Sequence, residues 1–306
     1  MTYHIQQVNS LADIKTAIET TLSGEGWSLA NGVLHRGAVY ARLVVDGDWL
    51  HLHAGTGASG GSVTGGPQGG GVARLGAIIR AGANTPIPFP ARLMIFVFDT
   101  EVYAVLNMNV EEYQYLAFGQ SGAPGIPGTG VWFAGTLPKD VSGYNGGNAF
   151  NMNPMAGGQS NDLGSTSACA IFWMNIDVPY WRGDTNSYIH HGYTDAGAAN
   201  AWVTTLAQLP LAPLLNLQPN AWNSESVLLP LRAYVERPEG KSSLAGELQN
   251  ARLLRIDYLD PEQIVTLGPD RWMVFPWFKK NIAARDGTTG GSILHSGTLG
   301  WAIRVQ

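Results

Sequence analysis

The stretch Arg92-Leu-Met-Ile-Phe-Val-Phe98, Asp99-Thr-Glu101, Val102-Tyr-Ala-Val-Leu-Asn-Met108 decides the fold class. Two runs rich in aromatic and branched side chains flank a short polar turn, which is the pattern of a β-hairpin. Tyr113–Phe118 follows as another short apolar run of the same kind. The sequence therefore predicts antiparallel strands at the centre of the fold.

Two more hairpins are predicted upstream of this stretch. Trp27–Ala30 and Val33–Arg36 flank Asn31-Gly32, a pair that readily takes the two positive φ angles of a type I′ turn. Ala38–Val45 and Trp49–Ala54 flank a polar turn at 46–48. These segments extend the antiparallel pattern toward the N-terminus.

One helix is predicted, over Leu11–Leu22. Ser10 and Asp13 have the S-x-x-D spacing of a capping box. Apolar residues recur on one helical face at Leu11, Ile14, Ile18 and Leu22. The first 120 residues are therefore expected to form one domain, a helix packed on an antiparallel meander.

The second half, residues 121–306, is expected to form a β-rich domain with long loops. The boundary is placed at Ser121–Gly130, which is rich in proline and glycine. A short helix is predicted at Ala198–Leu209. The predicted strands are Val131–Leu137, Ser167–Val178, Val227–Val235, Ala251–Tyr258, Trp272–Phe275 and Trp301–Val305. The predicted fold class is mainly β: antiparallel sheets or a sandwich, with one N-terminal helix and long glycine-rich loops.

The chain carries little charge. Charged residues are 13% of its 306 residues, against a usual ~25%, and the formal net charge is −5. Two explanations stay open: much of the surface lies against other subunits, or Gly, Ser, Thr and Asn solvate it. No basic stripe is present, so nucleic-acid binding is not expected.

The single cysteine and the absence of targeting signals indicate a protein made in the cytoplasm. Cys169 has no partner for an intrachain disulfide, and its apolar neighbours favour a buried, inert thiol. Met1–Gln7 lacks the features of a signal peptide, and no apolar run approaches the ~20 residues of a membrane span. Membrane insertion is therefore not expected.

Glycine-rich segments are the candidates for intersubunit contacts. Gly55–Gly71 contains nine glycines, and Gly143–Gly164 is similarly loop-like. Each is a flexible loop or an arm that neighbouring subunits order. The interface residues predicted in these and other loops are Gly55, Gly57, Gly60, Gly66, Gly71, Tyr144, Trp181 and Trp222.

Short sequence motifs give little support for a nucleotide-binding, metal-binding or receptor-binding site. Gly55–Gly60 matches G-x-G-x-x-G, but the residues that follow are a poor helix start, which argues against a dinucleotide site. His51 and His53 share a strand face without a third ligand nearby in sequence, so solvent-facing histidines are favoured over a metal site. The adjacent His190-His191 pair is a weaker case. Arg182-Gly-Asp184 is a common chance tripeptide. No cofactor, metal or catalytic residue is predicted.

The sequence also shows no recognisable catalytic motif. The sequence contains no G-x-S-x-G nucleophile elbow. A glycosidase would need two facing carboxylates, and sequence alone does not pair the candidates Asp184, Asp195, Glu225 and Glu247.

Aromatic residues near proline or glycine allow three interpretations. They pack back onto the sheets, fill pockets between subunits, or stack on sugars. The first is favoured. The residues concerned are Trp132, Phe133, Tyr180, Trp181, Trp202, Trp222, Trp277 and Phe278.

Three segments resemble a class of virion structural proteins of tailed bacteriophages, described as tail-tip, baseplate or tail-fibre-associated. The first, Ala17–Gly57, contains Gly26-Trp27 and Leu34-His-Arg-Gly37; the second, Arg92–Phe118, leads to the stretch Tyr115-Leu-Ala-Phe-Gly119. The third combines Leu228-Leu-Pro-Leu231, Gly246-Glu-Leu248 and Trp272–Trp277 with Trp301-Ala-Ile-Arg304. One difference is that Gln114–Gly122 is not followed by the Pro/Tyr-rich stretch found in the family.

The resemblance implies a non-enzymatic part of the virion tail, made in the host cytoplasm, which forms a homo-oligomer and contacts other tail proteins. A symmetric ring or trimer is the expected arrangement, with the glycine-rich segments as intersubunit arms. Two alternatives from other classes are a host-surface glycan-binding module and a glycan-degrading enzyme. Glycan binding predicts exposed aromatics in a shallow groove, and an enzyme predicts two carboxylates in a cleft.

Overall fold

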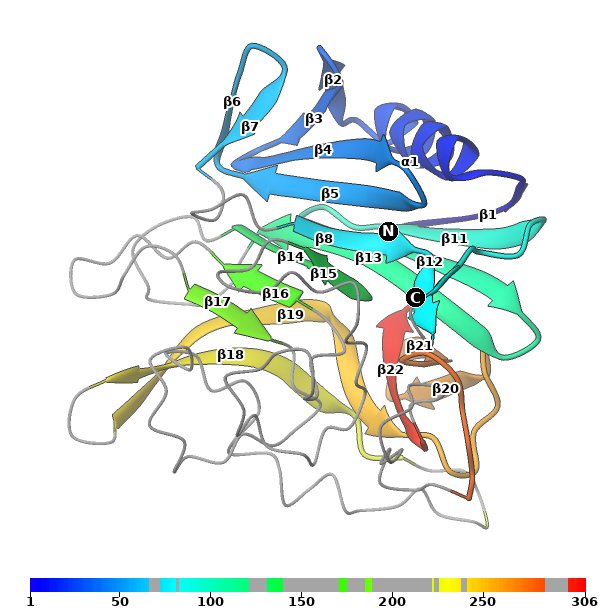
Figure 1. The fold of residues 1–306 in the computed structure, drawn as a ribbon. Helices are drawn as coiled ribbons and strands as arrows, with labels where there is room; N and C mark the ends of the chain where they lie inside the picture. Colours follow the sequence, from blue (N-terminus) through cyan, green and yellow to red (C-terminus); the bar gives the residue numbers. More distant parts are fainter. Residues whose placement is uncertain are drawn as a thin grey trace.

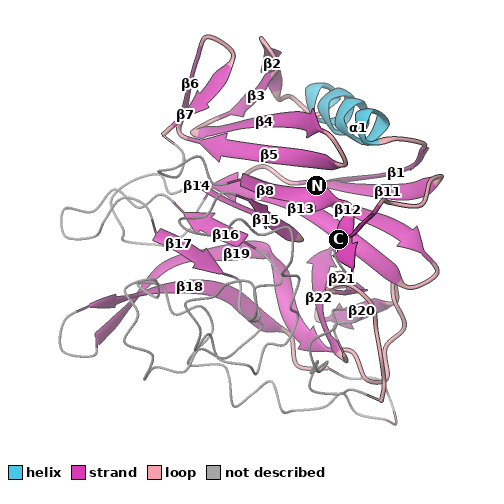
Figure 2. Ribbon diagram, in the orientation of Figure 1, coloured by secondary structure: helices cyan, strands magenta, loops and turns pink. Residues whose placement is uncertain are grey.

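The computed structural model describes residues 1–65, 72–80, 83–120, 131–139, 171–174, 185–188, 222, 226–237, 241–283 and 297–306. Within these residues the chain is antiparallel β structure with one α-helix, α1 (Leu11–Gly24), near the N-terminus (Figure 2). The mainly β fold class predicted from sequence is confirmed.

Most strands belong to three sheets. The central sheet has the order β1-β11-β12-β13-β14-β16-β17, the helix-side sheet β15-β8-β5-β4-β3-β2, and the C-terminal sheet β18-β19-β22-β21-β20. Two hairpins, β6-β7 and β9-β10, form separate two-stranded sheets.

The strand bounds follow, sheet by sheet. The central sheet comprises β1 (Thr2–Val8), β11 (Ala91–Val97), β12 (Glu101–Asn109), β13 (Glu112–Gln120), β14 (Val131–Gly135), β16 (Ile171–Met174) and β17 (Thr185–Tyr188). The helix-side sheet comprises β2 (Ser28–Ala30), β3 (Val33–Arg36), β4 (Val39–Asp46), β5 (Trp49–Gly55), β8 (Val72–Gly76) and β15 (Leu137–Lys139). The C-terminal sheet comprises β18 (Leu229–Arg237), β19 (Lys241–Arg255), β20 (Ile264–Leu267), β21 (Asp270–Pro276) and β22 (Leu299–Arg304). The small hairpins are β6 (Gly57–Ser59) with β7 (Ser62–Thr64), and β9 (Ile78–Arg80) with β10 (Ala83–Thr85).

The helix forms as its sequence predicts. The Ser10 hydroxyl accepts a hydrogen bond from the Asp13 N–H at 3.0 Å, which satisfies one of the unpaired donors of the first turn. Ile14, Ile18 and Leu22 are buried on the face that contacts the sheets, and Leu11 is partly buried at its start. The cap and the apolar stripe together fix where α1 begins and which face it buries.

The predicted hairpins are confirmed with small shifts at their ends. Asn31 and Gly32 have φ angles of 52° and 75°, as a type I′ turn between β2 and β3 requires. Asp46 pairs with Trp49 across the β4–β5 turn, and Val97 pairs with Val102 across the β11–β12 turn. However, the single meander expected over the first 120 residues is divided between two sheets.

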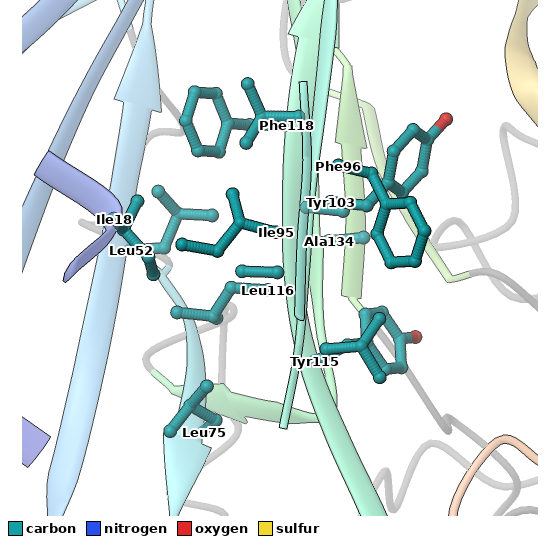
Figure 3. Packing of buried hydrophobic residues seen from close by; sticks show 14 of the residues in the cluster. Ile18, Leu52, Leu75, Ile95, Phe96, Tyr103, Tyr115, Leu116, Phe118 and Ala134 are labelled. Atoms are coloured by element: carbon teal, nitrogen blue, oxygen red, sulfur yellow. The ribbon is translucent and has the colours of Figure 1, made fainter. Parts of the chain in front are cut away.

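The three sheets stack with the central sheet in the middle (Figure 1). On one face of the central sheet, Ile95, Leu116 and Phe118 point toward the helix-side sheet and α1 (Figure 3). Phe96 and Tyr115, on the other face, contact Phe275 and Trp301 of the C-terminal sheet. Because both faces are covered, β11, β12 and β13 are apolar almost without alternation.

The predicted strand Val131–Leu137 is wrong as a single element, because the chain changes sheet within it. β14 pairs with β13 in the central sheet, whereas β15 pairs with β8 in the helix-side sheet. Thr136, fully buried between them, accepts a hydrogen bond from the Tyr115 N–H at 2.7 Å through its hydroxyl. The hydroxyl takes the place of a strand carbonyl as the acceptor for the Tyr115 N–H, where the chain leaves the central sheet.

The C-terminal strands are confirmed in position, with shifts at their ends. β18, β19, β21 and β22 overlap the four predicted segments, and β19 begins ten residues earlier than predicted, at Lys241 rather than Ala251, and ends at Arg255 rather than Tyr258. Of the predicted strand Ser167–Val178, residues 171–174 are described and form β16. The predicted loops Ser121–Gly130 and Gly143–Gly164 and the predicted helix Ala198–Leu209 lie outside the described residues. The domain boundary near residue 120 stays a prediction.

Candidate functional site

The predicted interface segment begins as a β-hairpin rather than a loop. Gly55 ends β5, Gly57 starts β6, and Gly60 lies in the β6–β7 turn. Gly60 and Gly61 have φ angles of 57° and 79°, which residues with a side chain rarely adopt, so two consecutive glycines allow the tight reversal. Of the two predicted forms, the flexible loop is therefore wrong for residues 55–65, and the intersubunit arm stays a prediction. Gly66 and Gly71 lie outside the described residues.

The β6–β7 hairpin follows the end of β5, and its turn lies beside the β2–β3 turn (Figure 1), since a Cβ added to Gly61 would come 3.2 Å from the Asn31 carbonyl oxygen. Ala58, Ser59, Ser62 and Thr64 are exposed along it. No charged residue occurs in the sequence between His53 and Arg74. The hairpin therefore presents a small, neutral, polar surface.

The glycine pattern in this hairpin is not a dinucleotide-binding fingerprint. After Gly60 the chain enters β7, so the helix N-terminus that would face a pyrophosphate is not formed there. Gly60 instead allows the turn, and Gly57 allows close packing against Thr64.

Of the other predicted interface residues, Trp222 is described and is 95% exposed, whereas Tyr144 and Trp181 lie outside the described residues. Trp132, Phe133, Trp277 and Phe278 are fully buried. For these four residues, packing onto the protein's own sheets is confirmed. Tyr180 and Trp202 lie outside the described residues.

An aromatic cluster joins the central and C-terminal sheets. Trp301 stacks on Trp277 with ring centroids 4.9 Å apart and an interplanar angle of 11°. Tyr115 packs against Trp301 at 4.7 Å, and Tyr103 lies 5.8 Å from both Trp132 and Trp301. Such ring contacts each add roughly 0.5–1.5 kcal/mol beyond the area they bury. No sequence pattern indicates this cluster, because its members come from β12, β13, β14, β22 and the residue that follows β21.

Glu101 is a fully buried carboxylate of the central sheet that accepts hydrogen bonds from the C-terminal sheet. Its Oε1 accepts the Gln249 N–H at 2.7 Å. Its Oε2 accepts the Asn250 N–H at 2.9 Å, the Asn250 side-chain amide at 2.7 Å and the Tyr103 hydroxyl at 2.9 Å. Burial raises the pKa of the Glu101 carboxyl, and these hydrogen bonds offset part of that rise.

The Glu101 carboxylate oxygens accept hydrogen bonds from a β-bulge in β19. Pro230 of β18 pairs with Arg252 and the next residue, Leu231, pairs with Leu248, so residues 249–251 have no partner in β18. The Arg252 guanidinium donates to the carbonyls of Leu248, Gln249 and Ala251 at 2.7–3.2 Å. Glu101 thus satisfies donors of the bulge while Arg252 satisfies its acceptors, which indicates a structural rather than a catalytic carboxylate. Of the carboxylates considered for catalysis, Glu247 lies in β19 and is partly buried, whereas Asp184, Asp195 and Glu225 lie outside the described residues.

The two histidines of β5 share a face, as predicted from their spacing. Their ring centroids are 6.4 Å apart. His51 is 4% exposed, contrary to the expectation of a solvent-facing side chain, and its Nδ1 lies 3.9 Å from Asp46 Oδ2. Among the described residues, no group of three or more His, Cys, Asp and Glu side chains could hold a metal ion. Cys169, Arg182–Asp184 and His190-His191 lie outside them.

In the described part of the chain, no helix is long and apolar enough to cross a membrane. The sequence matches no family model and no curated protein.

Proposed function

We propose that this chain is a structural component of a tailed-phage virion, located at the tail tip or baseplate, which assembles through subunit interfaces without catalysis. The observation that carries the proposal is the β6–β7 hairpin. It lies in the segment predicted to contact other subunits, and it presents exposed, neutral residues at the end of the helix-side sheet, beside the β2–β3 turn.

The chemistry of the hairpin suits a contact between subunits. Ala58, Ser59 and Ser62 are short side chains that lose little conformational entropy when they are buried. Neutral residues also avoid the cost of removing charges from water. A neighbouring copy of this chain is the occupant we propose, in a symmetric ring or trimer.

The buried groups of the body support the same role. The aromatic cluster and the Glu101 hydrogen bonds join sheets from distant parts of the sequence. A body fixed in this way holds an arm in a defined position, which lowers the entropy cost of assembly. The low charge of the whole chain agrees with a surface that lies partly against neighbours.

The location is tested in particles purified from cells that carry the coding sequence. Mass spectrometry should find the chain in the tail fraction, in several copies per particle. Absence from intact particles would contradict the proposal.

The role of the hairpin is tested by placing a charge on it. Ala58→Glu should lower the oligomer mass measured by light scattering, because the carboxylate would be buried at the contact. Val110→Glu is the matched control, since Val110 is 86% exposed in the β12–β13 turn, and it should leave the mass unchanged. Equal masses for Ala58→Glu and the parent protein would remove the hairpin from the interface.

Glycan binding keeps one observation in its favour, the 95% exposed indole of Trp222. A glycan array separates this function from a purely structural one. Binding that Trp222→Ala abolishes, with the fold intact, would favour a receptor-recognition module.

A further inference from the structure

Among the described strands, β1 forms an open edge of the central sheet. This strand pairs with β11 over seven consecutive residues, from Thr2 with Val97 to Val8 with Ala91, without a register shift. It stands first in the sheet order, so no described strand lies on its other side (Figure 1). Ile5, Gln6 and Gln7 are exposed there, with Ile5 at 53%.

The β1 edge lacks the features that normally protect a sheet edge. Proteins prevent edge pairing with short strands, lysine, proline or bulges. The other terminal strands of the three sheets follow this rule: β2, β15, β17 and β20 have three or four residues, and β18 contains a proline, charged residues and two register shifts. β1 has seven residues with no proline, glycine, lysine, arginine or carboxylate.

Contacts with α1 hold the strand in place. The Thr2 hydroxyl donates to Glu25 at 2.7 Å, and His4 Nε2 lies 2.9 Å from the same carboxylate, which caps the C-terminal end of α1. On the opposite face, Tyr3 stacks on Phe96 with ring centroids 4.6 Å apart. The edge is therefore formed before any partner arrives.

We propose that β1 pairs with β1 of a second copy of this chain, antiparallel and around a two-fold axis at Ile5. In this register Ile5 meets the partner's Ile5, His4 meets the partner's Gln6, and Tyr3 meets the partner's Gln7. No like charges oppose each other, and the half-exposed isoleucine becomes buried. A two-fold contact uses the same patch on both copies, so one neutral strand suffices.

This interface does not depend on the virion role and lies apart from the β6–β7 hairpin. It predicts an even number of subunits, with the central sheets of two copies joined into one. A trimer built through the hairpin alone would contradict it while leaving the proposed function intact.

Light scattering on the full chain and an Ile5→Lys variant provides the first test. The variant should have half the mass of the parent protein, because two lysines would meet at the axis. Leu267→Lys is the matched control: Leu267 is 56% exposed at the edge strand β20, and its substitution should leave the mass unchanged. A monomeric or odd-numbered parent, or an Ile5→Lys variant of unchanged mass, overturns the proposal.

Cross-linking tests the register. In a Cys169→Ser background, Ile5→Cys should form a disulfide-linked dimer on mild oxidation, because directly opposed residues have Cα atoms roughly 4.5–5.5 Å apart, within the range for a disulfide. Leu267→Cys in the same background should not. Equal cross-linking of the two variants contradicts the pairing at Ile5.

Discussion

Gln114 binds the main chain of Gly76 through both ends of its side-chain amide. Its Oε1 accepts the Gly76 N–H at 2.7 Å, and its Nε2 donates to the Gly76 carbonyl at 2.8 Å. Both groups are buried, Gln114 in β13 of the central sheet and Gly76 at the end of β8 in the helix-side sheet. One side chain thus acts as a strand partner between two layers.

Gln114→Leu should lower the free energy of unfolding by roughly 2–5 kcal/mol, because it leaves a donor and an acceptor buried without partners. Urea denaturation measures the loss. Gln249→Leu is the control: the Gln249 side chain is exposed, so the change should have little effect. Equal stability of the Gln114→Leu variant and the parent would mean that water replaces the amide.

Gly76→Ala should be strongly destabilising, by about 2–4 kcal/mol. Gly76 has a φ of +148°, and an added Cβ would overlap the Asp48 carbonyl oxygen and lie 2.8 Å from the Trp49 Cα. Gly24→Ala is the matched control, since nothing lies within 4 Å of its Cβ position at the end of α1. That change should raise stability by about 0.5–1 kcal/mol. Thermal unfolding of both variants tests the contrast.

Glu101→Gln should lower stability at neutral pH by roughly 1–3 kcal/mol, because an amide presents N–H groups to donors that now bind a carboxylate. The pH dependence follows from the raised pKa of Glu101. At pH values between the pKa of Glu101 in the unfolded state and its higher pKa in the folded state, the folded protein binds more protons than the unfolded one. The contribution of Glu101 to the free energy of unfolding is therefore greatest below the unfolded-state pKa, and it falls as pH rises through the folded-state pKa.

The stability difference between parent and Glu101→Gln should therefore grow as pH falls from 7 toward the ordinary carboxyl range. Urea titrations at successive pH values measure it. A difference that shrinks on acidification would contradict a raised pKa.

Ser10→Ala should cost about 1 kcal/mol, because the Asp13 N–H loses its acceptor at the start of α1. Ser23→Ala is the control, since the Ser23 hydroxyl donates to the Glu19 carbonyl within the helix and caps nothing. Its effect should stay within about 0.5 kcal/mol. Circular dichroism during thermal unfolding distinguishes the two.

Local chemistry explains what sequence could predict. The Ser10 cap and the Asn31-Gly32 turn were predictable because each depends on residues within a few positions. The continuous apolar runs of β11–β13 correctly indicated strands, but alternation could not show which face each residue covers, because both faces are buried.

Long-range contacts explain what sequence could not predict. Glu101 binds Gln249, which is 148 positions away, and Gln114 binds Gly76 at a separation of 38. No local pattern marks Thr136 as the residue where the chain changes sheet. For the candidate interface, sequence located the β6–β7 segment but not its hairpin form, and it gave no sign that β1 is an edge strand.

The two-sided burial of the central sheet has a consequence for synthesis on the ribosome. β11, β12 and β13 emerge well before Phe275 and Trp301, which later cover Phe96 and Tyr115. Until the C-terminal sheet has been translated, that aromatic face stays open to water and to other nascent chains. Translation pauses or chaperones that shield residues 91–120 during this interval should therefore govern how much soluble protein a cell produces.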